Sequence, residues 1–153
     1  MSLIFNNLNE VGTERLGKAL SKRLFPGAFL ALYGDLGAGK TAFTRAIATG
    51  LQIFDIMSPT FTIVREHETP SGVKFFHFDA YRLADADELF AIGYEDYLAQ
   101  NAIIAMEWCE NVLEALPPHR LEIHISGSGN ESRTIEFVPI GARYSAMLEG
   151  IIL

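Results

Sequence analysis

Residues 32–43 read LYGDLGAGKTAF, and this stretch contains the most informative pattern of the chain. Gly34, Gly39, Lys40 and Thr41 stand at the spacing G-x-x-x-x-G-K-[ST]. In this pattern the glycines let backbone N–H groups approach phosphate groups closely, and the lysine reaches the same phosphates. The spacing therefore predicts a phosphate-binding loop.

The segments on either side of the loop have the patterns that such a loop requires. Residues 28–33, AFLALY, form a short apolar run typical of a strand buried on both faces. Residues 40–51 place Phe43, Ile47 and Leu51 four apart, which indicates a helix. A strand before the loop and a helix after it are the context in which this motif binds phosphates, so the context supports the prediction.

The loop predicts a nucleotide ligand with a magnesium ion. We expect the loop backbone and Lys40 to hold the phosphates, and the Thr41 hydroxyl to bind Mg²⁺, because this hard cation prefers oxygen ligands. GTPases usually carry a Lys-x-Asp element for guanine, and none of the four lysines has Asp two residues later, so ATP is favoured. The residues assigned to the nucleotide are Gly34, Asp35, Leu36, Gly37, Ala38, Gly39, Lys40 and Thr41.

Two carboxylates follow apolar runs further along the chain. FFHFD ends in Asp79 and AIIAME ends in Glu107. Phosphate-loop enzymes usually place an acid at the end of a second buried strand, where it orients Mg²⁺ or its water. Spacing alone does not rank the two acids. Because the run before Glu107 is more uniformly apolar, we assign Glu107 to the metal and Asp79 to positioning or deprotonating the attacking water.

Two further polar features carry weaker signals. Ser58-Pro59-Thr60 forms a rigid turn with two hydroxyls, in the region where nucleotide switches often order around the γ-phosphate, although a plain turn is the simpler interpretation. His77 alternates with Asp79 but has no second His or Cys at ligand spacing. A packed histidine is therefore favoured over a metal ligand.

The rest of the chain alternates between helical and extended patterns. Helices are expected over 12–24, 83–98, 109–118 and 142–150, and strands over 58–67, 73–81, 101–108, 120–126 and 132–139, with turns at 68–72 and 127–131. Strands that alternate with helices early and form hairpins elsewhere predict a mixed α/β sheet with a parallel centre. The length of 153 residues fits one compact domain, assigned to 1–153.

Composition and charge restrict the class of protein. The net charge is −7 and the basic residues are scattered, so stand-alone binding of nucleic acid is not expected. Cys109 is the only cysteine, which leaves no internal disulfide. The sequence shows no signal-peptide pattern and no apolar run near the roughly 18 residues of a membrane span. We expect a reduced, cytoplasmic protein without membrane association.

Four segments together resemble one family. GDLGAGKT, SPTFT, FHFDAYRL and IAMEW occur in this order and at these separations in a short chain. With these segments the sequence resembles the TsaE family, also called YjeE, from about Glu10 to Val138. The loop alone is unspecific, whereas the four segments in combination are specific to this family.

The resemblance implies a bacterial P-loop ATPase with a three-layer α/β fold of the P-loop NTPase type, in which antiparallel strands flank parallel central ones. It implies Mg-dependent binding of ATP or ADP and slow hydrolysis in support of the TsaD and TsaB proteins. That pair forms N6-threonylcarbamoyladenosine at position 37 of tRNAs that read ANN codons. TsaD binds the tRNA, so no direct tRNA binding by this chain alone is expected.

The family's site residues are carried over by motif match. The resemblance implies that Lys40 and the loop backbone hold the phosphates, that Thr41 and Glu107 face Mg²⁺, and that Asp79 lies near the γ-phosphate. These assignments coincide with those made from the residues alone.

Other assignments rest on the resemblance only. The turn at 58–60 is switch-like, and Thr60 is assigned to the catalytic group with Asp79 and Lys40. For the adenine we assign Glu10, Thr13 and Arg133. The family pattern includes Trp108 but gives it no derivable role.

Two alternatives to a partner-dependent ATPase remain open. A small-molecule kinase usually needs an Arg-rich lid, and the stretch from Ala84 to Gln100 contains no Arg or Lys. A nucleotide-sensing interaction module without useful turnover would keep its partner function when hydrolysis is abolished. Arg82 and Arg45 are the nearest candidates for an arginine that assists hydrolysis, and neither is an obvious one, which fits slow turnover.

Overall fold

The computed structural model describes residues 2–35, 37–54, 56, 63–127 and 132–151. The strands in these ranges are β1 (Leu3–Leu8), β2 (Phe29–Tyr33), β3 (Val64–Glu68), β4 (Lys74–Asp79), β5 (Ile103–Glu107), β6 (Arg120–Ser126) and β7 (Arg133–Ile140). The helices are α1 (Glu10–Ser21), α2 (Lys40–Gly50), α3 (Ala86–Ala91), α4 (Tyr94–Leu98) and α5 (Ala142–Met147). Two short 3₁₀ turns follow β5, at Cys109–Asn111 and Leu113–Ala115.

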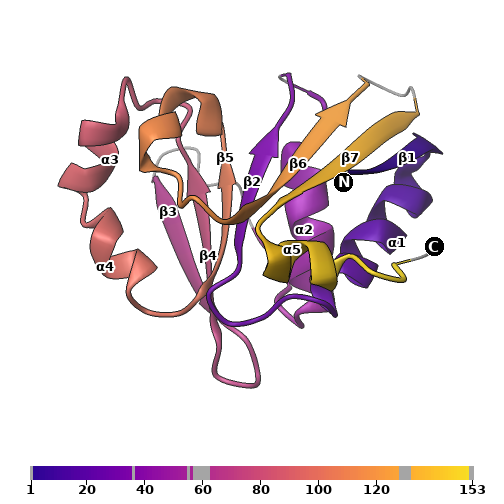
Figure 1. Cartoon of the computed structure of the whole chain (residues 1–153), viewed down its shortest axis with the longest axis horizontal. Helices are drawn as coiled ribbons and strands as arrows, with labels where there is room; N and C mark the ends of the chain where they lie inside the picture. The colour runs from indigo at the N-terminus through magenta and orange to yellow at the C-terminus, as the bar shows by residue number, and fades with distance from the viewer. Residues whose placement is uncertain (1, 36, 55, 57–62, 128–131, 152–153) are drawn as a thin grey trace.

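All of these strands join one sheet in the order β1-β7-β6-β2-β5-β4-β3 (Figure 1). The central pairs β6–β2, β2–β5 and β5–β4 are parallel. The flanking pairs β1–β7, β7–β6 and β3–β4 are antiparallel. The prediction of a mixed sheet with parallel central strands and antiparallel flanking strands is therefore confirmed. The carboxyl ends of the parallel strands share one edge, and the glycine-rich loop follows β2 at this edge.

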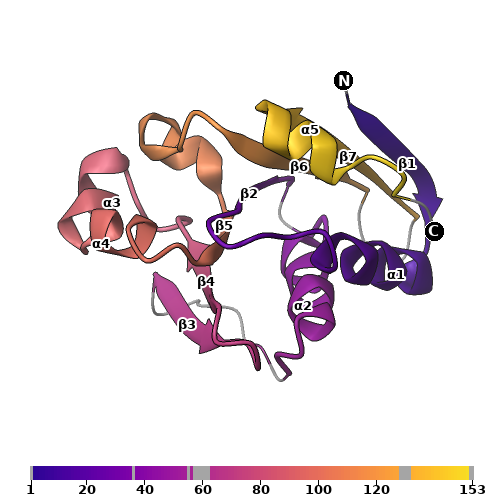
Figure 2. The same ribbon diagram turned by 60° about the horizontal axis from the view of Figure 1, so that its bottom comes forward.

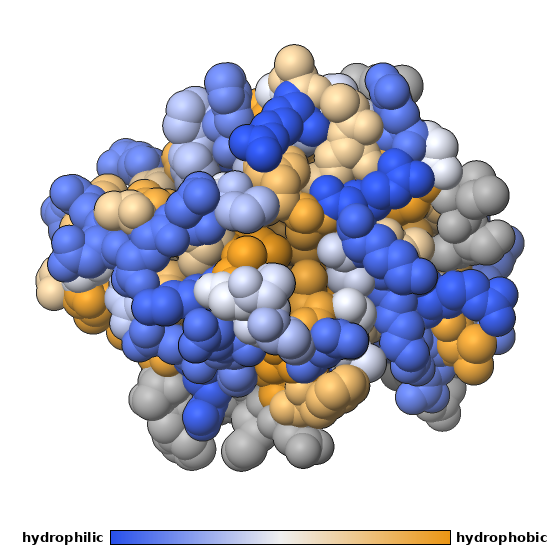
Figure 3. Space-filling model, turned by 90° about the horizontal axis from the view of Figure 1, so that it is seen from below, coloured by the Kyte–Doolittle hydropathy of each residue, from blue (hydrophilic) through white to orange (hydrophobic). Residues whose placement is uncertain are grey.

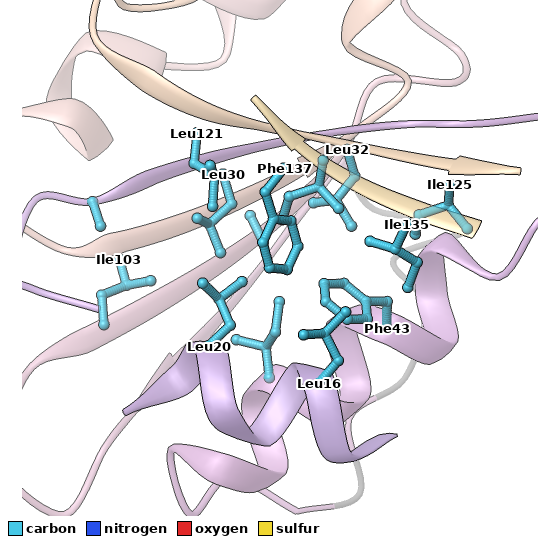
Figure 4. Packing of buried hydrophobic residues seen from close by; sticks show 14 of the residues in the cluster. Leu16, Leu20, Leu30, Leu32, Phe43, Ile103, Leu121, Ile125, Ile135 and Phe137 are labelled. Atoms are coloured by element: carbon cyan, nitrogen blue, oxygen red, sulfur yellow. The ribbon is translucent and has the colours of Figure 1, made fainter. Parts of the chain in front are cut away.

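The sheet is covered on both faces, as the apolar run of β2 predicts. Leu30 and Leu32 point into a cluster with residues of α1 and α2, while Phe29 and Ala31 belong to a second cluster with residues of α3 and α4. Figure 2 shows α1 and α2 side by side on one face of the sheet. Figure 4 shows the first cluster, in which the leucines of α1 and Phe43 of α2 point toward the strands. This arrangement gives the predicted three layers.

Helices α1 and α2 approach each other closely because small residues lie between them. A Cβ atom added to Gly17 would lie 2.5 Å from the Ala46 Cβ. One added to Gly50 would lie 2.0 Å from the Ser21 Oγ. The absence of side chains at these two glycines thus sets the separation of the helices, and with it the position of α1 relative to the loop at the start of α2.

Replacing Gly17 with alanine is expected to destabilise the fold by about 1–2 kcal/mol. Overpacking a rigid contact costs about 1–3 kcal/mol, and the better helix propensity of alanine returns at most about 1 kcal/mol. The Ala46 Cβ is attached directly to the backbone of α2 and has no rotamer with which to move away. Urea unfolding followed by circular dichroism measures the free energy of unfolding.

Gly12→Ala is the matched control, because it makes the same change on the same helix. The Cβ atom added there would meet only side-chain atoms of Asn9 and Leu8, at 3.3 Å. We expect Gly12→Ala to leave the free energy of unfolding within about 1 kcal/mol of wild type. A Gly17→Ala protein as stable as this control would show that the α1–α2 contact can widen without cost.

The structure corrects several predicted elements. The helix expected over 83–98 is two helices, because Gly93 adopts a left-handed conformation with φ 88° between them. The helix expected over 109–118 is two 3₁₀ turns, since Trp108 (φ 61°) and Val112 (φ −137°, ψ 34°) leave helical geometry. Strand β1 was not predicted. Its alternating residues Leu3 and Phe5 pack on the core, but two asparagines interrupt the pattern.

Other boundaries differ by a few residues. The helix expected over 12–24 is Glu10–Ser21, because the Asn9 side chain accepts the Gly12 N–H at 2.7 Å and caps an earlier start. The helix expected over 142–150 ends at Met147. Of the strand expected over 58–67, the described part is β3, which continues to Glu68.

Figure 3 views the edge opposite the loop, where the parallel strands begin. Hydrophilic residues surround an apolar area in the middle of this face. Among the residues described, no helix is long and apolar enough to cross a membrane.

Candidate functional site

The glycine-rich loop connects the buried strand β2 to helix α2. Gly34 follows the strand with φ 156°, and a Cβ atom there would lie 2.6 Å from the Ile125 carbonyl oxygen. Gly39 precedes the first helical residue with φ 106°, in the left-handed region that favours glycine. The glycines of the motif are thus required by the backbone. They bring the loop against the N-terminus of α2, whose free N–H groups can hold an anion.

Lys40 lies inside this loop. Its side chain is 5% exposed, and its ammonium donates to the Gly34 carbonyl oxygen at 2.5 Å. The same ammonium lies 3.5 Å from the centre of the Trp108 ring. Trp108 has φ 61° and its ring packs against Tyr81, with ring centres 5.0 Å apart. The Trp108 ring therefore covers the lysine of the loop through a cation–π interaction. This contact could not be derived from the sequence.

Thr41 and Glu107 meet below the loop. The Thr41 hydroxyl lies 3.1 Å from Glu107 Oε1 and 3.3 Å from Oε2. Glu107 ends β5, the strand paired in parallel with β2, and is 3% exposed. Two adjacent oxygen-bearing side chains at the edge of the sheet match the ligand preference of a magnesium ion. The described residues hold no group of three or more His, Cys, Asp or Glu side chains suited to a metal, so the remaining ligands would come from phosphates and water.

Asp79 ends β4 and lies opposite Glu107 in the parallel β4–β5 register. Its Oδ1 accepts the Tyr81 N–H at 2.9 Å. Burial raises the pKa of Asp79 and the Glu107 carboxylate adds to this, while the Tyr81 N–H, His77 and Lys40 oppose it. A half-buried carboxylate with a raised pKa, next to a second carboxylate, is a stronger proton acceptor than an ordinary aspartate.

A cavity of about 660 Å³ opens beside the loop, between α1, α2 and β7. Three of its lining residues, Glu10, Thr13 and Arg133, are those assigned to the adenine. Thr13 Oγ1 is buried and has no hydrogen-bond partner within the described part of the chain, which is costly unless a ligand supplies one. The Arg133 guanidinium lies 3.5 Å from the Gly37 carbonyl oxygen. The structure thus joins the residues assigned to the base and those of the loop in one continuous site.

Some assigned residues lie outside the part of the chain that the structure describes. These are Leu36 of the loop and the switch-like turn with Thr60. Asp35 lies at the exposed turn of the loop, and its carbonyl oxygen accepts the Ala38 N–H at 2.9 Å. The predictions for Leu36 and Thr60 stay predictions.

His77 is the residue whose place in the site sequence analysis missed. It is fully buried, as expected for a packed histidine, but its Nε2 lies 2.5 Å from Glu107 Oε2. The signal was its alternation with Asp79: both side chains point to the same face of β4, next to the strand that ends in Glu107. Recognising it required the β4–β5 register, which the sequence does not give.

Comparison with known proteins identifies the family. The profile described as "Threonylcarbamoyl adenosine biosynthesis protein TsaE" matches residues 8–135. The chain belongs to the TsaE family. TsaE of Bacillus subtilis is 38% identical over 149 residues, covering 96% of this chain and 92% of that protein. TsaE of Haemophilus influenzae is 39% identical over 136 residues, covering 85% of each chain.

A solved structure supports the same relationship. The crystal structure of Bacillus subtilis YdiB superimposes with a TM-score of 0.83 at 34% identity, covering 99% of this chain and 94% of that one. The three-layer P-loop NTPase fold expected for a TsaE family member is thereby confirmed. The site residues from Glu10 to Arg133 all lie within the region that matches the TsaE profile.

His67, on strand β3, is expected to make the stability of this TsaE family member depend on pH. Burial lowers the pKa of His67 on β3, and the nearby His77 and Arg65 lower it further. His67 therefore contributes stability above its unfolded pKa of about 6.5, and this stability is lost as pH falls through the lower folded pKa. We expect the free energy of unfolding to fall more steeply below pH 6.5 in wild type than in His67→Leu.

Urea unfolding at a series of pH values tests this, with pH 8 as the common reference. The two proteins should show parallel curves above pH 7 and diverge below about pH 6.5. Parallel curves down to pH 5 would mean that His67 binds a proton equally well in the folded and unfolded chain.

Proposed function

We propose that this chain binds Mg-ATP at the glycine-rich loop and hydrolyses it slowly. In this proposal hydrolysis supports a TsaD–TsaB complex that forms N6-threonylcarbamoyladenosine at position 37 of tRNAs reading ANN codons. The observation that carries the proposal is the contact between the Thr41 hydroxyl and the buried Glu107 carboxylate directly below the loop. Together with the names of the relatives, it supports a nucleotide-dependent role in this modification.

The loop and the edge of the sheet provide separate places for phosphates and metal. Backbone N–H groups at the start of α2 and the Lys40 ammonium would hold the phosphates. Thr41 and Glu107 would hold Mg²⁺, which when bound neutralises charge on the phosphate oxygens. Lys40 contacts the Gly34 carbonyl oxygen, and a phosphate would offer its ammonium a stronger, charged acceptor.

The cavity beside the loop would take the nucleoside. Its volume is within the range of small-ligand sites, and the unpartnered Thr13 hydroxyl offers a hydrogen bond to a polar base edge. Thr13→Val keeps the shape of the side chain and removes the hydroxyl. We expect ADP affinity to fall about 10-fold, the size of one lost hydrogen bond in a buried site.

Inorganic tripolyphosphate provides the matched control for Thr13→Val, because it has no base. Calorimetry should show the same tripolyphosphate affinity for the variant and wild type. Equal losses for both ligands would place Thr13 near the phosphates instead of the base.

Asp79 is the residue that would act on the attacking water. It lies beside Glu107 at the end of the neighbouring strand, and its raised pKa makes it a stronger proton acceptor than an ordinary aspartate. Hydrolysis is expected to be slow in the isolated chain, because an arginine supplied by a partner can raise such rates by about 10³-fold or more.

The charge of the chain supports a role through protein partners. A net charge of −7 disfavours direct binding of tRNA, whose phosphates require basic residues. In the proposed assembly the TsaD protein binds the tRNA, and this chain acts on TsaD and TsaB.

Steady-state phosphate release from Mg-ATP, with and without the TsaD–TsaB pair, tests the proposal. We expect low release by the chain alone and strong stimulation by the pair. Intact ATP binding without stimulation would overturn the partner-dependent ATPase and favour a nucleotide-sensing module. A small acceptor phosphorylated at the expense of ATP would instead identify a kinase.

A further inference from the structure

His77 contacts the site through Glu107 but is not among the residues assigned to the phosphates, the metal or the base. It lies on β4, is 0% exposed, and its Nε2 lies 2.5 Å from Glu107 Oε2. Thr41 approaches the same carboxylate from above, at 3.1 Å from Oε1. The Glu107 carboxylate is therefore held from two sides, by a hydroxyl of the loop helix and by an imidazole of the adjacent strand.

Because Glu107 is buried, its carboxylate depends on these two contacts for hydrogen bonds. Its side chain lies at the end of an entirely buried strand, where a carboxylate without hydrogen-bond donors would be costly. A carboxylate can only accept, so in this contact His77 Nε2 carries the hydrogen. Side chains that donate to a metal-binding carboxylate fix its orientation and tune its affinity for the metal.

The second ring nitrogen of His77, Nδ1, makes no hydrogen bond with the described residues. Nδ1 is buried and has no hydrogen-bond partner among the residues that the structure describes. The imidazole is thus connected to the polar part of the site through Glu107 alone. A histidine that served only to fill space could be replaced by an apolar side chain at no cost to Glu107, whereas this one provides the carboxylate with a donor.

We propose that His77 is a positioning residue for Glu107. By holding Oε2, it keeps Oε1 directed at Thr41 and free for Mg²⁺. The inference rests on the proposed function, because it concerns the metal of the nucleotide complex. It predicts that loss of the His77 N–H weakens the effect of magnesium on nucleotide binding and leaves metal-free binding unchanged.

Calorimetric titration with ADP, in excess Mg²⁺ and in EDTA, separates the two effects at pH 8. The quantity compared is the ratio of the two affinities. For His77→Leu we expect this ratio to fall about 10-fold, the usual effect of removing a donor to a metal ligand, with the EDTA affinity unchanged. His67→Leu is the matched control, because it removes a histidine from the adjacent strand β3 and should retain the wild-type ratio.

A second pair of variants decides the question if His77→Leu does not fold. His77→Gln places an amide N–H about as far from the backbone as Nε2. Its affinity ratio should therefore be close to that of wild type. His77→Asn is one methylene shorter and should lower the ratio as leucine does. A ratio that is unchanged in the leucine variant, or equal in the glutamine and asparagine variants, would overturn the inference.

The same titrations distinguish this inference from the proposed function. Wild-type protein that binds no ADP in either condition would overturn both. Wild-type protein whose magnesium effect survives the loss of His77 would overturn the inference alone.

Discussion

Replacing Lys40 with alanine is expected to lower phosphate release from Mg-ATP at least 100-fold. A preorganised donor that stabilises charge in the transition state contributes about 10²–10³ to the rate, and Lys40 is the only lysine of the loop. Its ammonium is already enclosed between the Gly34 carbonyl oxygen and the Trp108 ring, so little reorganisation is needed when a phosphate replaces the carbonyl. ADP affinity should fall as well, because in the proposed complex the same ammonium would pair with the β-phosphate.

Lys74→Ala is the matched control for Lys40→Ala. Lys74 is an exposed lysine at the start of β4, and its ammonium lies 3.1 Å from the Gln100 side chain. Phosphate release and ADP affinity should equal those of wild type. Phosphate release near the wild-type rate in Lys40→Ala would mean that the loop holds its ligand through backbone groups alone.

Replacing Asp79 with asparagine should separate hydrolysis from binding. A general base contributes about 10²–10⁴ to the rate, so we expect phosphate release to fall at least 100-fold. ADP affinity should be retained, because the amide oxygen can still accept the Tyr81 N–H that holds this side chain. Single-turnover phosphate release and calorimetry measure the two quantities.

The stability of Asp79→Asn provides an internal check. Because the folded pKa of Asp79 is raised, its contribution to stability is present below the unfolded pKa of about 4 and is lost as pH rises through the folded pKa. An amide does not titrate, so the variant should gain stability relative to wild type between pH 4 and neutral pH. A variant that lost both stability and ADP binding would have a structural defect, and its slow hydrolysis would say nothing about a base.

Asp87→Asn on α3 makes the same change at an exposed acid and should alter neither quantity. An Asp79→Asn protein that hydrolyses ATP at the wild-type rate would contradict the role of Asp79. If it lacks hydrolysis yet still supports the TsaD–TsaB pair, the nucleotide-sensing alternative is favoured.

The loop and the parallel centre of the sheet could be predicted because both are local patterns. The spacing of the glycines reflects backbone angles, and the apolar run of β2 reflects burial on both faces. The order of the strands needs contacts between distant segments, and no local pattern contains it. Strand β1 was missed for a related reason, since its pairing with β7 stabilises a segment whose own alternation is short.

The two carboxylates show where sequence reasoning about the site stops. Asp79 and Glu107 both follow apolar runs, and only the register shows that they lie side by side and that Glu107 faces Thr41. The contacts of Trp108 and His77 also depend on three-dimensional placement. Trp108 itself adopts a left-handed backbone conformation, which no periodicity predicts, and its ring reaches Lys40.

The close packing of α1 against α2 sets the distance between the two ends of the candidate site. Helix α1 bears Glu10 and Thr13, and helix α2 begins with Lys40 and Thr41, so the two ends of a long ligand would be held by different helices. The two helices pack so closely at Gly17 that a Cβ atom added there would lie 2.5 Å from the Ala46 Cβ. This packing would set the distance between the two ends of the site before a ligand binds, so a ligand of matching length would bind without the entropy cost of adjusting the helices.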